Sequence, residues 1–250
     1  MYYKEYGEEH SALMVFVHGG GVSGWMWDKQ IEHFCSKFHC LVPDLPEHGR
    51  SKKGLQFTIN DVADEINKLI EEKGKGKRVI VIGFSLGAQV LIAMLSKKPH
   101  LIDFAMVNSA LVKQIPFANA LIKSMMFAFP LVRFRAFSNI QAKSMYIDKD
   151  YQVTYFQESG QMNKDAFVRI MNENMSFKIP SSFESSTSKI LVTVGEKERK
   201  IMRDSMNEIM ESNPNCKGRI FTKMGHGVSL ANPKLFNTTI EEWIENETSD

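Results

Sequence analysis

The residue in this sequence best suited to nucleophilic chemistry is Ser85. It lies at the centre of residues 83–87, which read G-F-S-L-G. A β-branched run at 79–82 precedes this pattern, and apolar residues with helical spacing follow it up to residue 95. A sharp turn from a buried strand into a helix exposes a serine hydroxyl, and the unpaired N–H groups that begin the helix favour an anion beside it. G-x-S-x-G also occurs in ordinary loops, so the strand before it and the helix after it carry the prediction of a nucleophile.

A serine hydroxyl becomes a good nucleophile only when a base removes its proton, and His226 is placed to be that base. It lies between two glycines in a loop, directly after an expected strand at 219–222. A carboxylate must orient the imidazole and stabilise its protonated form. A serine, an acid and a histidine in this order along the chain is one of the known arrangements of such residues.

A glycine-rich loop accompanies these residues. Residues 18–21 read H-G-G-G and follow an expected strand at 13–17, and three glycines let backbone N–H groups approach a ligand closely. In open parallel sheets, sites form beyond the carboxyl ends of the strands. The glycine loop, Ser85, Glu198 and His226 all follow such ends, and their coincidence is more specific than any one motif.

The elements that must position these residues alternate between strands and helices. Buried strands are expected at 13–17, 40–42, 79–82, 104–107, 189–195 and 219–222, with an edge strand at 2–6. Helices are expected at 25–37, 59–73, 86–97 and 201–211, and a closing helix begins at Pro233. Thr58 and Asp61 resemble a capping box for the helix at 59–73. This alternation predicts an α/β protein with a doubly wound, mostly parallel sheet.

The alternation stops between residues 113 and 180. This stretch holds 8 of the 17 Phe and 6 of the 15 Met. Phe117, Leu121, Met125 and Phe129 follow one helical face, Pro130 interrupts it, and another helix begins near Asp165. We expect residues 113–180 to be an inserted helical cap, and residues 1–112 and 181–250 to form the core domain. Most of these Phe and Met side chains should pack the cap against the core, and a few should line an apolar pocket.

Composition limits the partners and the setting. The chain has 250 residues, 43% of them hydrophobic, and a net charge of only +2. No basic stripe interleaves with aromatic residues, so we expect no nucleic-acid partner. No apolar run approaches the ~20 residues of a membrane span, so we expect no membrane partner. Three cysteines in no metal-binding spacing, and the lack of an apolar signal region, favour a reducing, cytoplasmic setting without disulfides or metal.

These motifs together resemble the α/β-hydrolase superfamily, in its capped, single-domain, esterase-like branch. The resemblance rests on the core segments 18–21, 43–51, 83–87, 195–198 and 225–226, and does not include the cap. It implies that Ser85 is the nucleophile and that His226 acts first as general base and then as general acid. It also implies an oxyanion hole from the backbone N–H groups of Leu86 and Gly20, with Gly21 as the alternative donor.

The resemblance assigns the acid of the triad to Glu198. Members of the family mostly have Asp at this position, and Glu196 and Asp204 remain alternatives. Glu47 stands where the family usually has glycine, and we attach no function to it. We expect Asp44 and His48 to fix a turn by hydrogen bonds, because such residues in Pro- and Gly-rich loops usually bond nearby backbone groups.

The expected reaction is hydrolysis of a small-to-medium apolar carboxylic ester through an acyl-enzyme, with no cofactor. The alternatives are a thioester, a lactone or a carbon–carbon bond cleaved by the same triad, or a slow-turnover ligand receptor. The expected partner is a small-molecule ester, and the chain is either a monomer or a homodimer.

Overall fold

Strand pairing organises the computed structural model, which describes residues 1–51 and 56–248. Seven strands form one sheet in the order β1-β3-β2-β4-β5-β6-β7. β1 pairs with β3 in the antiparallel sense, and every other pairing is parallel. The strands are β1 (Tyr3–Tyr6), β2 (Ala12–Val17), β3 (His39–Pro43), β4 (Arg78–Phe84), β5 (Phe104–Asn108), β6 (Lys189–Gly195) and β7 (Cys216–Phe221). The predicted α/β fold with a mostly parallel sheet is therefore confirmed.

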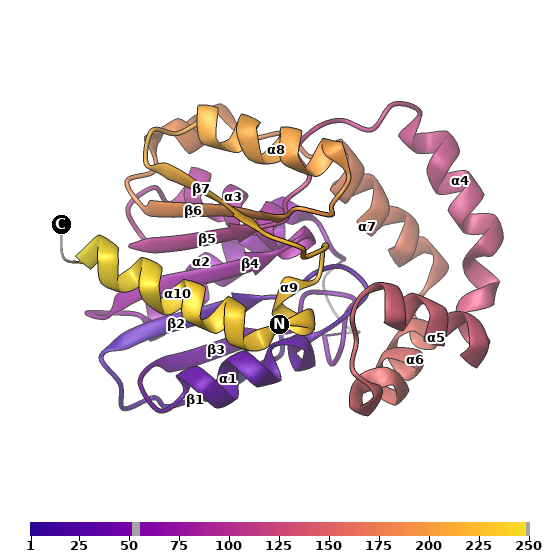
Figure 1. Ribbon diagram of the computed structural model, residues 1–250, viewed down its shortest axis with the longest axis horizontal. Helices are drawn as coiled ribbons and strands as arrows, with labels where there is room; N and C mark the ends of the chain where they lie inside the picture. Colours follow the sequence, from indigo (N-terminus) through magenta and orange to yellow (C-terminus); the bar gives the residue numbers. More distant parts are fainter. Residues whose placement is uncertain (52–55, 249–250) are drawn as a thin grey trace.

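Helices cover both faces of this sheet (Figure 1). The core helices are η1 (Gly24–Trp27), α1 (Asp28–Phe34), α2 (Ile59–Lys73), α3 (Leu86–Lys97), η4 (Ser181–Ser185), α8 (Lys200–Glu211), α9 (Val228–Ala231) and α10 (Pro233–Thr248). One apolar cluster joins α2, α3 and α8 to one set of strand side chains, and a second joins α1 and α10 to the opposite set. The alternating side chains of a strand explain this division.

Local sequence signals account for most of these boundaries. The Thr58 hydroxyl accepts a hydrogen bond from the Asp61 N–H at 3.0 Å, so α2 begins where the capping residues predict. In α10, the residues Phe236, Ile240, Trp243 and Ile244 are buried, as their spacing predicts.

Two predicted elements differ from the structure. The helix expected at 25–37 is divided into η1 and α1, because Trp25, Met26 and Trp27 are all buried and one face of an α-helix cannot point three consecutive side chains into the core. The last strand begins at Cys216 rather than at residue 219. β7 is the edge strand and Lys217–Ile220 are exposed, so its start has no apolar signal.

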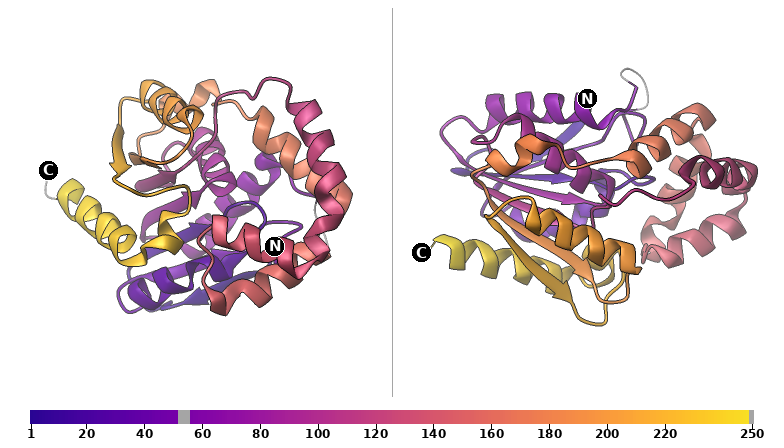
Figure 2. Two further views of the ribbon diagram at one scale, coloured as in Figure 1. Left: turned by 45° about the vertical axis from the view of Figure 1, so that its right-hand side comes forward. Right: turned by 90° about the horizontal axis from the view of Figure 1, so that it is seen from above.

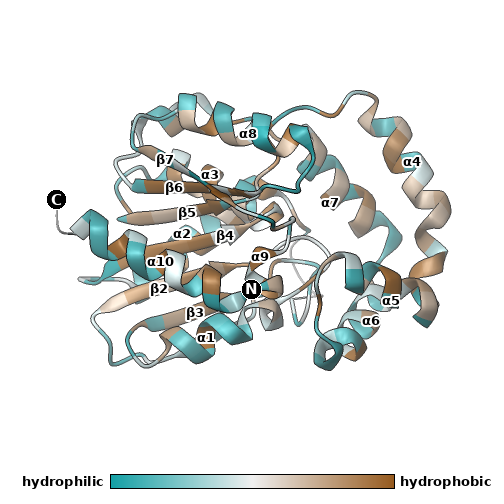
Figure 3. Cartoon of the chain, in the orientation of Figure 1, coloured by the Kyte–Doolittle hydropathy of each residue, from teal (hydrophilic) through white to brown (hydrophobic). Residues whose placement is uncertain are grey.

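Between β5 and β6 the chain forms a helical insertion. Its helices are α4 (Ala118–Ala128), η2 (Phe129–Arg133), α5 (Arg135–Ser144), η3 (Lys149–Tyr151), α6 (Gln152–Gln161) and α7 (Lys164–Ser176). These helices lie beside the carboxyl-end edge of the sheet, at the right of Figure 1, and both views of Figure 2 show them outside the sheet's two helical layers. The strands are mostly brown and the exposed core helices α8 and α10 largely teal in Figure 3, whereas α4 is brown to beige.

The apolar face expected for the first insertion helix is not buried as a unit. Phe117 and Leu121 are 87% and 41% exposed, and Ile122 is the buried residue of α4. The sequence spacing gives a helical period but does not tell which of two apolar faces meets the rest of the protein.

Candidate active site

Ser85 occupies the turn between β4 and α3 in a backbone conformation that few residues adopt. Its φ is 53° and its ψ is −114°, and such strain is retained where the surroundings enforce it. The Ser85 N–H donates to the Asn108 carbonyl at 2.9 Å. A Cβ on Gly83 would lie 2.6 Å from the Gly87 carbonyl oxygen, and a Cβ on Gly87 would collide with the Val17 carbonyl. The two glycines of the motif therefore let this turn close tightly against β2.

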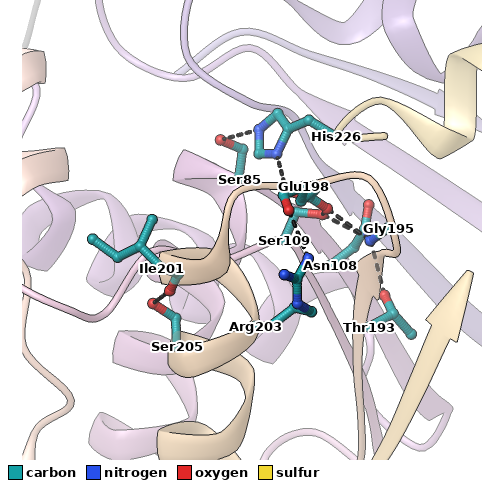
Figure 4. A network of polar contacts seen from close by, with 10 residues as sticks. All are labelled: Ser85, Asn108, Ser109, Thr193, Gly195, Glu198, Ile201, Arg203, Ser205 and His226. Carbon is teal, nitrogen blue, oxygen red and sulfur yellow. Dashed lines mark hydrogen bonds and ion pairs between the residues drawn. The ribbon is translucent and has the colours of Figure 1, made fainter. Parts of the chain in front are cut away.

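His226 bridges Ser85 and Glu198 (Figure 4). Its Nε2 lies 3.1 Å from the Ser85 hydroxyl oxygen, and its Nδ1 lies 2.6 Å from a Glu198 carboxylate oxygen. The imidazole packs on the Phe84 ring, with centroids 4.9 Å apart. The His226 side chain is 44% exposed, whereas that of Glu198 is 2% exposed. A buried carboxylate thus holds one side of an imidazole whose other side reaches the hydroxyl.

The Glu198 carboxylate is held by three donors. Besides His226, the Gly195 N–H and the Ser109 hydroxyl donate to its Oε1 at 2.8 Å and 2.7 Å. Burial alone would raise the pKa of Glu198. The hydrogen bond and charge of His226, with the bonds from Gly195 and Ser109, outweigh burial and hold this pKa below its usual value. Glu198 therefore stays ionised beside His226 at neutral pH.

The two alternative acids lie elsewhere. Glu196 is exposed, and its carboxylate accepts a hydrogen bond from the Lys223 N–H at 2.6 Å. Asp204 lies on α8 and pairs with Lys200 at 2.7 Å. The structure brings Glu198 to His226, and brings neither Glu196 nor Asp204 to it.

A cavity of about 240 Å³ opens over Ser85, between the core and the helical insertion. Its core side consists of Gly20, Gly21, Ser85 and Leu86. Its insertion side consists of Phe129, Val132, Gln141, Tyr155, Ser159, Met162, Phe167, Ile170, Met171 and Asn174. The wall is thus mainly apolar with a few polar groups, which is the composition of a small-molecule site.

A second cavity borders the same histidine. It measures about 350 Å³ and is lined by Ser144, Tyr146, Lys197, Glu198, Arg199, Met202, Gly225 and His226. His226 therefore lines this second cavity, which carries cations, while its Nε2 contacts Ser85, which lines the largely apolar first cavity.

Several residues that support this site carry no sequence motif. Ser109 follows β5 with a φ of 56°, and the Arg203 guanidinium donates to the carbonyls of Glu196 and Glu198 at 3.0 Å and 2.7 Å. Ser109 holds the acid loop from 89 positions away in the sequence, and Arg203 holds it from the helix that directly follows, α8. The only sequence signal for Ser109 is that it is a polar residue at the end of β5, the strand before β6. Its spacing from other residues does not distinguish it.

Several polar contacts join the insertion to the core. The Gln89 side-chain amide on α3 donates to the Asn174 backbone carbonyl on α7 at 2.8 Å, and the Asn174 side-chain amide donates to the Gln89 side-chain oxygen at 3.0 Å. The Glu158 carboxylate on α6 accepts from the Ser23 hydroxyl and the Trp25 indole, each at 2.9 Å. These contacts fix α6 and α7 above the cavity.

A further contact involves Glu47, to which the sequence analysis attaches no function. Its carboxylate binds the Arg169 guanidinium at 2.6 Å and 3.2 Å, and also accepts from the Phe57 N–H at 3.0 Å. The φ of Glu47 is 67°, a value that glycine adopts without strain. Glu47 therefore joins a core loop to α7.

The polar residues of the loop after β3 have structural roles, as predicted. Asp44 accepts hydrogen bonds from the N–H groups of Gly24 and Arg50, both at 2.8 Å. The His48 Nδ1 lies 3.0 Å from the Pro46 carbonyl. Neither side chain reaches Ser85, so this loop is held by its own backbone contacts.

His18 ties the glycine loop to the loop after β3. Its Nδ1 donates to the Gly19 carbonyl at 2.7 Å, and its Nε2 accepts from the Leu45 N–H at 2.9 Å. Burial and the neighbouring His48 lower the pKa of His18 to about 3. It is therefore a neutral imidazole with both ring nitrogens engaged.

Some kinds of site were not found in the described residues. Across residues 1–51 and 56–248, no group of three or more His, Cys, Asp or Glu side chains is arranged to hold a metal ion. Within the same ranges, no helix is both long and apolar enough to cross a membrane.

Comparisons with known proteins identify the family of this chain. A family model described as "Alpha/beta hydrolase family" matches residues 14–239. The chain is 23% identical over 262 residues to "Uncharacterized hydrolase YugF" of Bacillus subtilis, covering 98% of this chain and 94% of that protein. It is 25% identical over 187 residues to "Ethanol acetyltransferase 1" of Cyberlindnera jadinii, covering 71% of this chain and 52% of that protein. It is also 30% identical over 103 residues to an "AB hydrolase superfamily protein" of Gibberella zeae, covering 40% of this chain and 35% of that protein. The chain thus spans about half or less of these last two relatives.

Solved structures show the same fold at low sequence identity. MenH from S. aureus superposes with a TM-score of 0.80 at 17% identity, covering 99% of each chain. An esterase from Exiguobacterium antarcticum superposes with a TM-score of 0.82 at 14% identity, covering 98% of this chain and 95% of that one. Together with the family model, which matches most of the sequence, these findings show that the chain belongs to the alpha/beta hydrolase family of enzymes.

Proposed function

We propose that this protein is a serine hydrolase that cleaves a small-to-medium apolar carboxylic ester. The observation that carries the proposal is the hydrogen-bonded series from Ser85 through His226 to Glu198, at 3.1 Å and 2.6 Å. These distances lie within the range over which a base takes a proton from a nucleophile. The series opens into a cavity large enough for a small substrate.

Each residue has a defined step. Ser85 attacks the ester carbonyl while its proton passes to the Nε2 of His226, and Glu198 stabilises the imidazolium that results. His226 then returns the proton to the leaving alcohol, which leaves an acyl group on Ser85. Water, activated by the same imidazole, attacks the acyl group and releases the acid.

The backbone N–H groups of Leu86 and Gly20 are the proposed donors to the oxyanion. Leu86 is the first residue of α3, so its N–H has no partner within the helix. Gly20 lies beside it in the cavity wall, since a Cβ on Gly20 would lie 3.5 Å from the Leu86 side chain. Gly21, the alternative donor, also lines the cavity, but no atom lies within 4 Å of the position its Cβ would occupy. Gly20 is therefore the better donor alongside Leu86.

The cavity supports the proposed size and polarity of the substrate. At about 240 Å³ it is slightly smaller than the ~300–1,000 Å³ typical of pockets for drug-sized ligands. Most of its wall is Phe, Met, Ile, Leu and Val, so a short apolar acyl group fits better than a charged one. In this proposal residues 113–180 act as a cap domain that shapes the pocket, over a core of residues 1–112 and 181–250.

The same residues could also cleave a thioester, a lactone or a carbon–carbon bond. The fold could also belong to a ligand receptor with slow turnover. The 44% exposure of the His226 side chain favours hydrolysis over retention of a ligand, because water can reach the imidazole. Among the relatives, one is named an acetyltransferase, whose acyl acceptor is an alcohol by its printed name. Water and alcohol are then competing acceptors of the same acyl group.

The test is hydrolysis of p-nitrophenyl esters of increasing acyl length by the wild type and by Ser85→Ala. We expect turnover that peaks at one short acyl length and disappears in the variant. A fluorophosphonate probe should label the wild type at Ser85, as located by peptide mass spectrometry. Labelling without turnover of any ester would move the proposal to another acyl bond, and neither labelling nor turnover in a folded protein would favour the receptor.

A further inference from the structure

The outer face of the helical insertion carries large apolar side chains that no other part of the described chain covers. On α4, η2 and α5, and at the residues that precede α4 and α5, the exposed residues are Phe117, Leu121, Phe127, Leu131, Phe134 and Ile140, at 87%, 41%, 92%, 43%, 62% and 68%. We call this set of residues, together with the cations described next, the outer face. Of these helices, α4 forms the rim of the insertion farthest from the sheet, at the right of Figure 1. Exposed apolar residues concentrated in one stretch of the chain mark an interaction site more often than isolated ones do.

The charges of the outer face have a single sign. Lys123, Arg133, Arg135 and Lys143 are all exposed and lie on the same helices. No Asp or Glu occurs between residues 114 and 147, although the chain has 29 acidic residues. Within the described residues, none of these four cations has a carboxylate within 4.0 Å, and Arg135 lies over the Phe156 ring. The outer face is thus apolar and basic, with no acidic residue to balance it.

This combination argues against a second copy of the chain as the occupant. A symmetric dimer pairs a surface with itself. It would bring four cations from each copy together with no carboxylate between them. An occupant with an anionic surface and an apolar interior would pair with the cations and would also bury the aromatic rings.

We propose that the outer face is a docking surface for a membrane with anionic headgroups. Phe117, Phe127 and Phe134 would enter the boundary between headgroups and acyl chains, while Lys and Arg contact phosphate and carboxylate groups. The expectation of no membrane partner rested on the lack of a spanning segment, and a peripheral contact needs none.

The position of η2 gives this surface a connection to the cavity. Phe129 and Val132 of η2 line the cavity over Ser85, while Leu131 and Arg133 of the same short helix are exposed on the outer face. The docked membrane would therefore lie against the outside of the cavity wall. Docking itself does not depend on which bond the enzyme cleaves.

The test is co-sedimentation of the full-length protein with vesicles. One set contains phosphatidylcholine only, and the other contains phosphatidylcholine and phosphatidylserine in equal parts. We expect binding to the anionic vesicles to exceed binding to the neutral ones by about tenfold or more at low salt, and to fall as salt is added.

Two double variants and two matched controls locate the contact. Phe127→Ser with Phe134→Ser, and separately Arg133→Gln with Lys143→Gln, should each weaken binding to anionic vesicles by roughly tenfold or more. The controls are Ile220→Ser, an apolar residue 50% exposed on β7, and Lys68→Gln with Lys75→Gln, which remove the same charge from exposed core positions. Neither control should change binding. All substituted side chains are exposed, so thermal melting should stay at the wild-type temperature.

Specific results would overturn the proposal. Equal binding to neutral and anionic vesicles, or loss of binding in the controls but not in the outer-face variants, would contradict it. A concentration-dependent dimer that Phe127→Ser with Phe134→Ser abolishes, without vesicle binding by the wild type, would assign the face to self-association instead. Ser85→Ala should bind vesicles like the wild type, so failure of this proposal and failure of the proposed hydrolase activity are distinguishable.

Discussion

The Ser109 hydroxyl donates a hydrogen bond to Glu198 across 2.7 Å, from the end of β5 to the loop after β6. The two residues lie 89 positions apart in the sequence, with the whole helical insertion between them. Parallel pairing of β5 with β6 brings the ends of these strands together. The carboxylate proposed as the acid is therefore held from the strand next to its own, and its position does not depend on the insertion.

Loss of this hydroxyl should affect the pH dependence of activity as well as its rate. In Ser109→Ala the Glu198 carboxylate loses one stabilising donor, so its lowered pKa moves up toward the usual value. We expect kcat to fall by about tenfold, as for a lost hydrogen bond to a charged group. The fall in kcat on acidification should begin at a higher pH than in the wild type. Steady-state kinetics between pH 4 and pH 8 would measure both effects.

A matched variant separates the hydroxyl from the backbone at the same position. Ser109→Gly loses the same hydroxyl but relieves the positive φ of 56°. It should show the same altered pH profile as Ser109→Ala with greater stability. A wild-type pH profile in both variants would contradict a positioning role for Ser109.

Removal of the proposed nucleophile or base should abolish catalysis without unfolding the protein. Ser85→Ala and His226→Ala should each lower kcat by about 10⁴–10⁶-fold, because either change leaves only binding and the oxyanion donors. The measurement is ester hydrolysis, with circular dichroism as the control for folding. Either variant retaining more than about a tenth of wild-type kcat would refute its assigned role.

The choice of acid is tested by three single variants. Glu198→Ala should lower kcat by about 10³–10⁴-fold, less than the loss of the serine, because the imidazole remains but is no longer oriented. Glu196→Ala and Asp204→Ala should stay near the wild-type rate, since neither carboxylate contacts His226. A near-normal Glu198→Ala beside an inactive Glu196→Ala or Asp204→Ala would reassign the acid.

The Glu47–Arg169 pair should stabilise the protein in a pH-dependent way. Burial would raise the pKa of Glu47, but the Arg169 guanidinium and the Phe57 N–H outweigh it and hold the pKa below 4.5. A lowered carboxyl pKa gives stability that is present above pH 4.5 and is lost as the pH falls through the folded-state value. Glu47→Gln should therefore reduce the free energy of unfolding by about 1–3 kcal/mol at neutral pH, and by less near pH 3.

Glycine at the same position separates the ion pair from backbone strain. Glu47→Gly also loses the ion pair, but it relieves a φ of 67°, so its destabilisation should be smaller than that of Glu47→Gln by about 1 kcal/mol. Urea unfolding of the two variants would measure the difference. Equal stability of Glu47→Gln and wild type at neutral pH would show that the pair contributes nothing.

The folded protein should become less stable at acidic pH because His18 is buried as a neutral imidazole. Burial and His48 hold the pKa of His18 at about 3, against 6.5 in the unfolded chain. As the pH falls below 6.5, the unfolded chain binds a proton that the folded protein does not, so stability declines until about pH 3. The slope from one such group is about 1.4 kcal/mol per pH unit. Burial lowers the pKa of His48 as well, which adds in the same direction.

Urea unfolding at pH 7 and pH 5 would measure this dependence. His18→Asn should be less stable than wild type at pH 7, because the contacts to Gly19 and Leu45 are lost. Its stability should depend less steeply on pH. Identical pH slopes in the two proteins would contradict a neutral, buried His18.

The sequence alone determined the sheet and the places where chemistry should gather. Runs such as residues 79–82 are apolar on both faces, which a parallel strand requires, and residues 83–87 specify a turn that few other sequences fit. Ser85, Glu198 and His226 follow strand ends, and the carboxyl ends of parallel strands share one edge of a sheet. Local signals of this kind need no knowledge of distant residues.

The contacts between segments far apart in the sequence were decided by the tertiary structure alone. Only the fold brings Ser109 to the acid loop and Arg169 to Glu47, because contacts between residues about 90 or more positions apart leave no periodic pattern in a single sequence. It also decided which face of α4 is exposed, since Phe117 and Ile122 are both apolar and only packing separates 87% exposure from 4%. A sequence specifies that a side chain prefers burial, but the neighbours that would bury it must come from elsewhere in the fold.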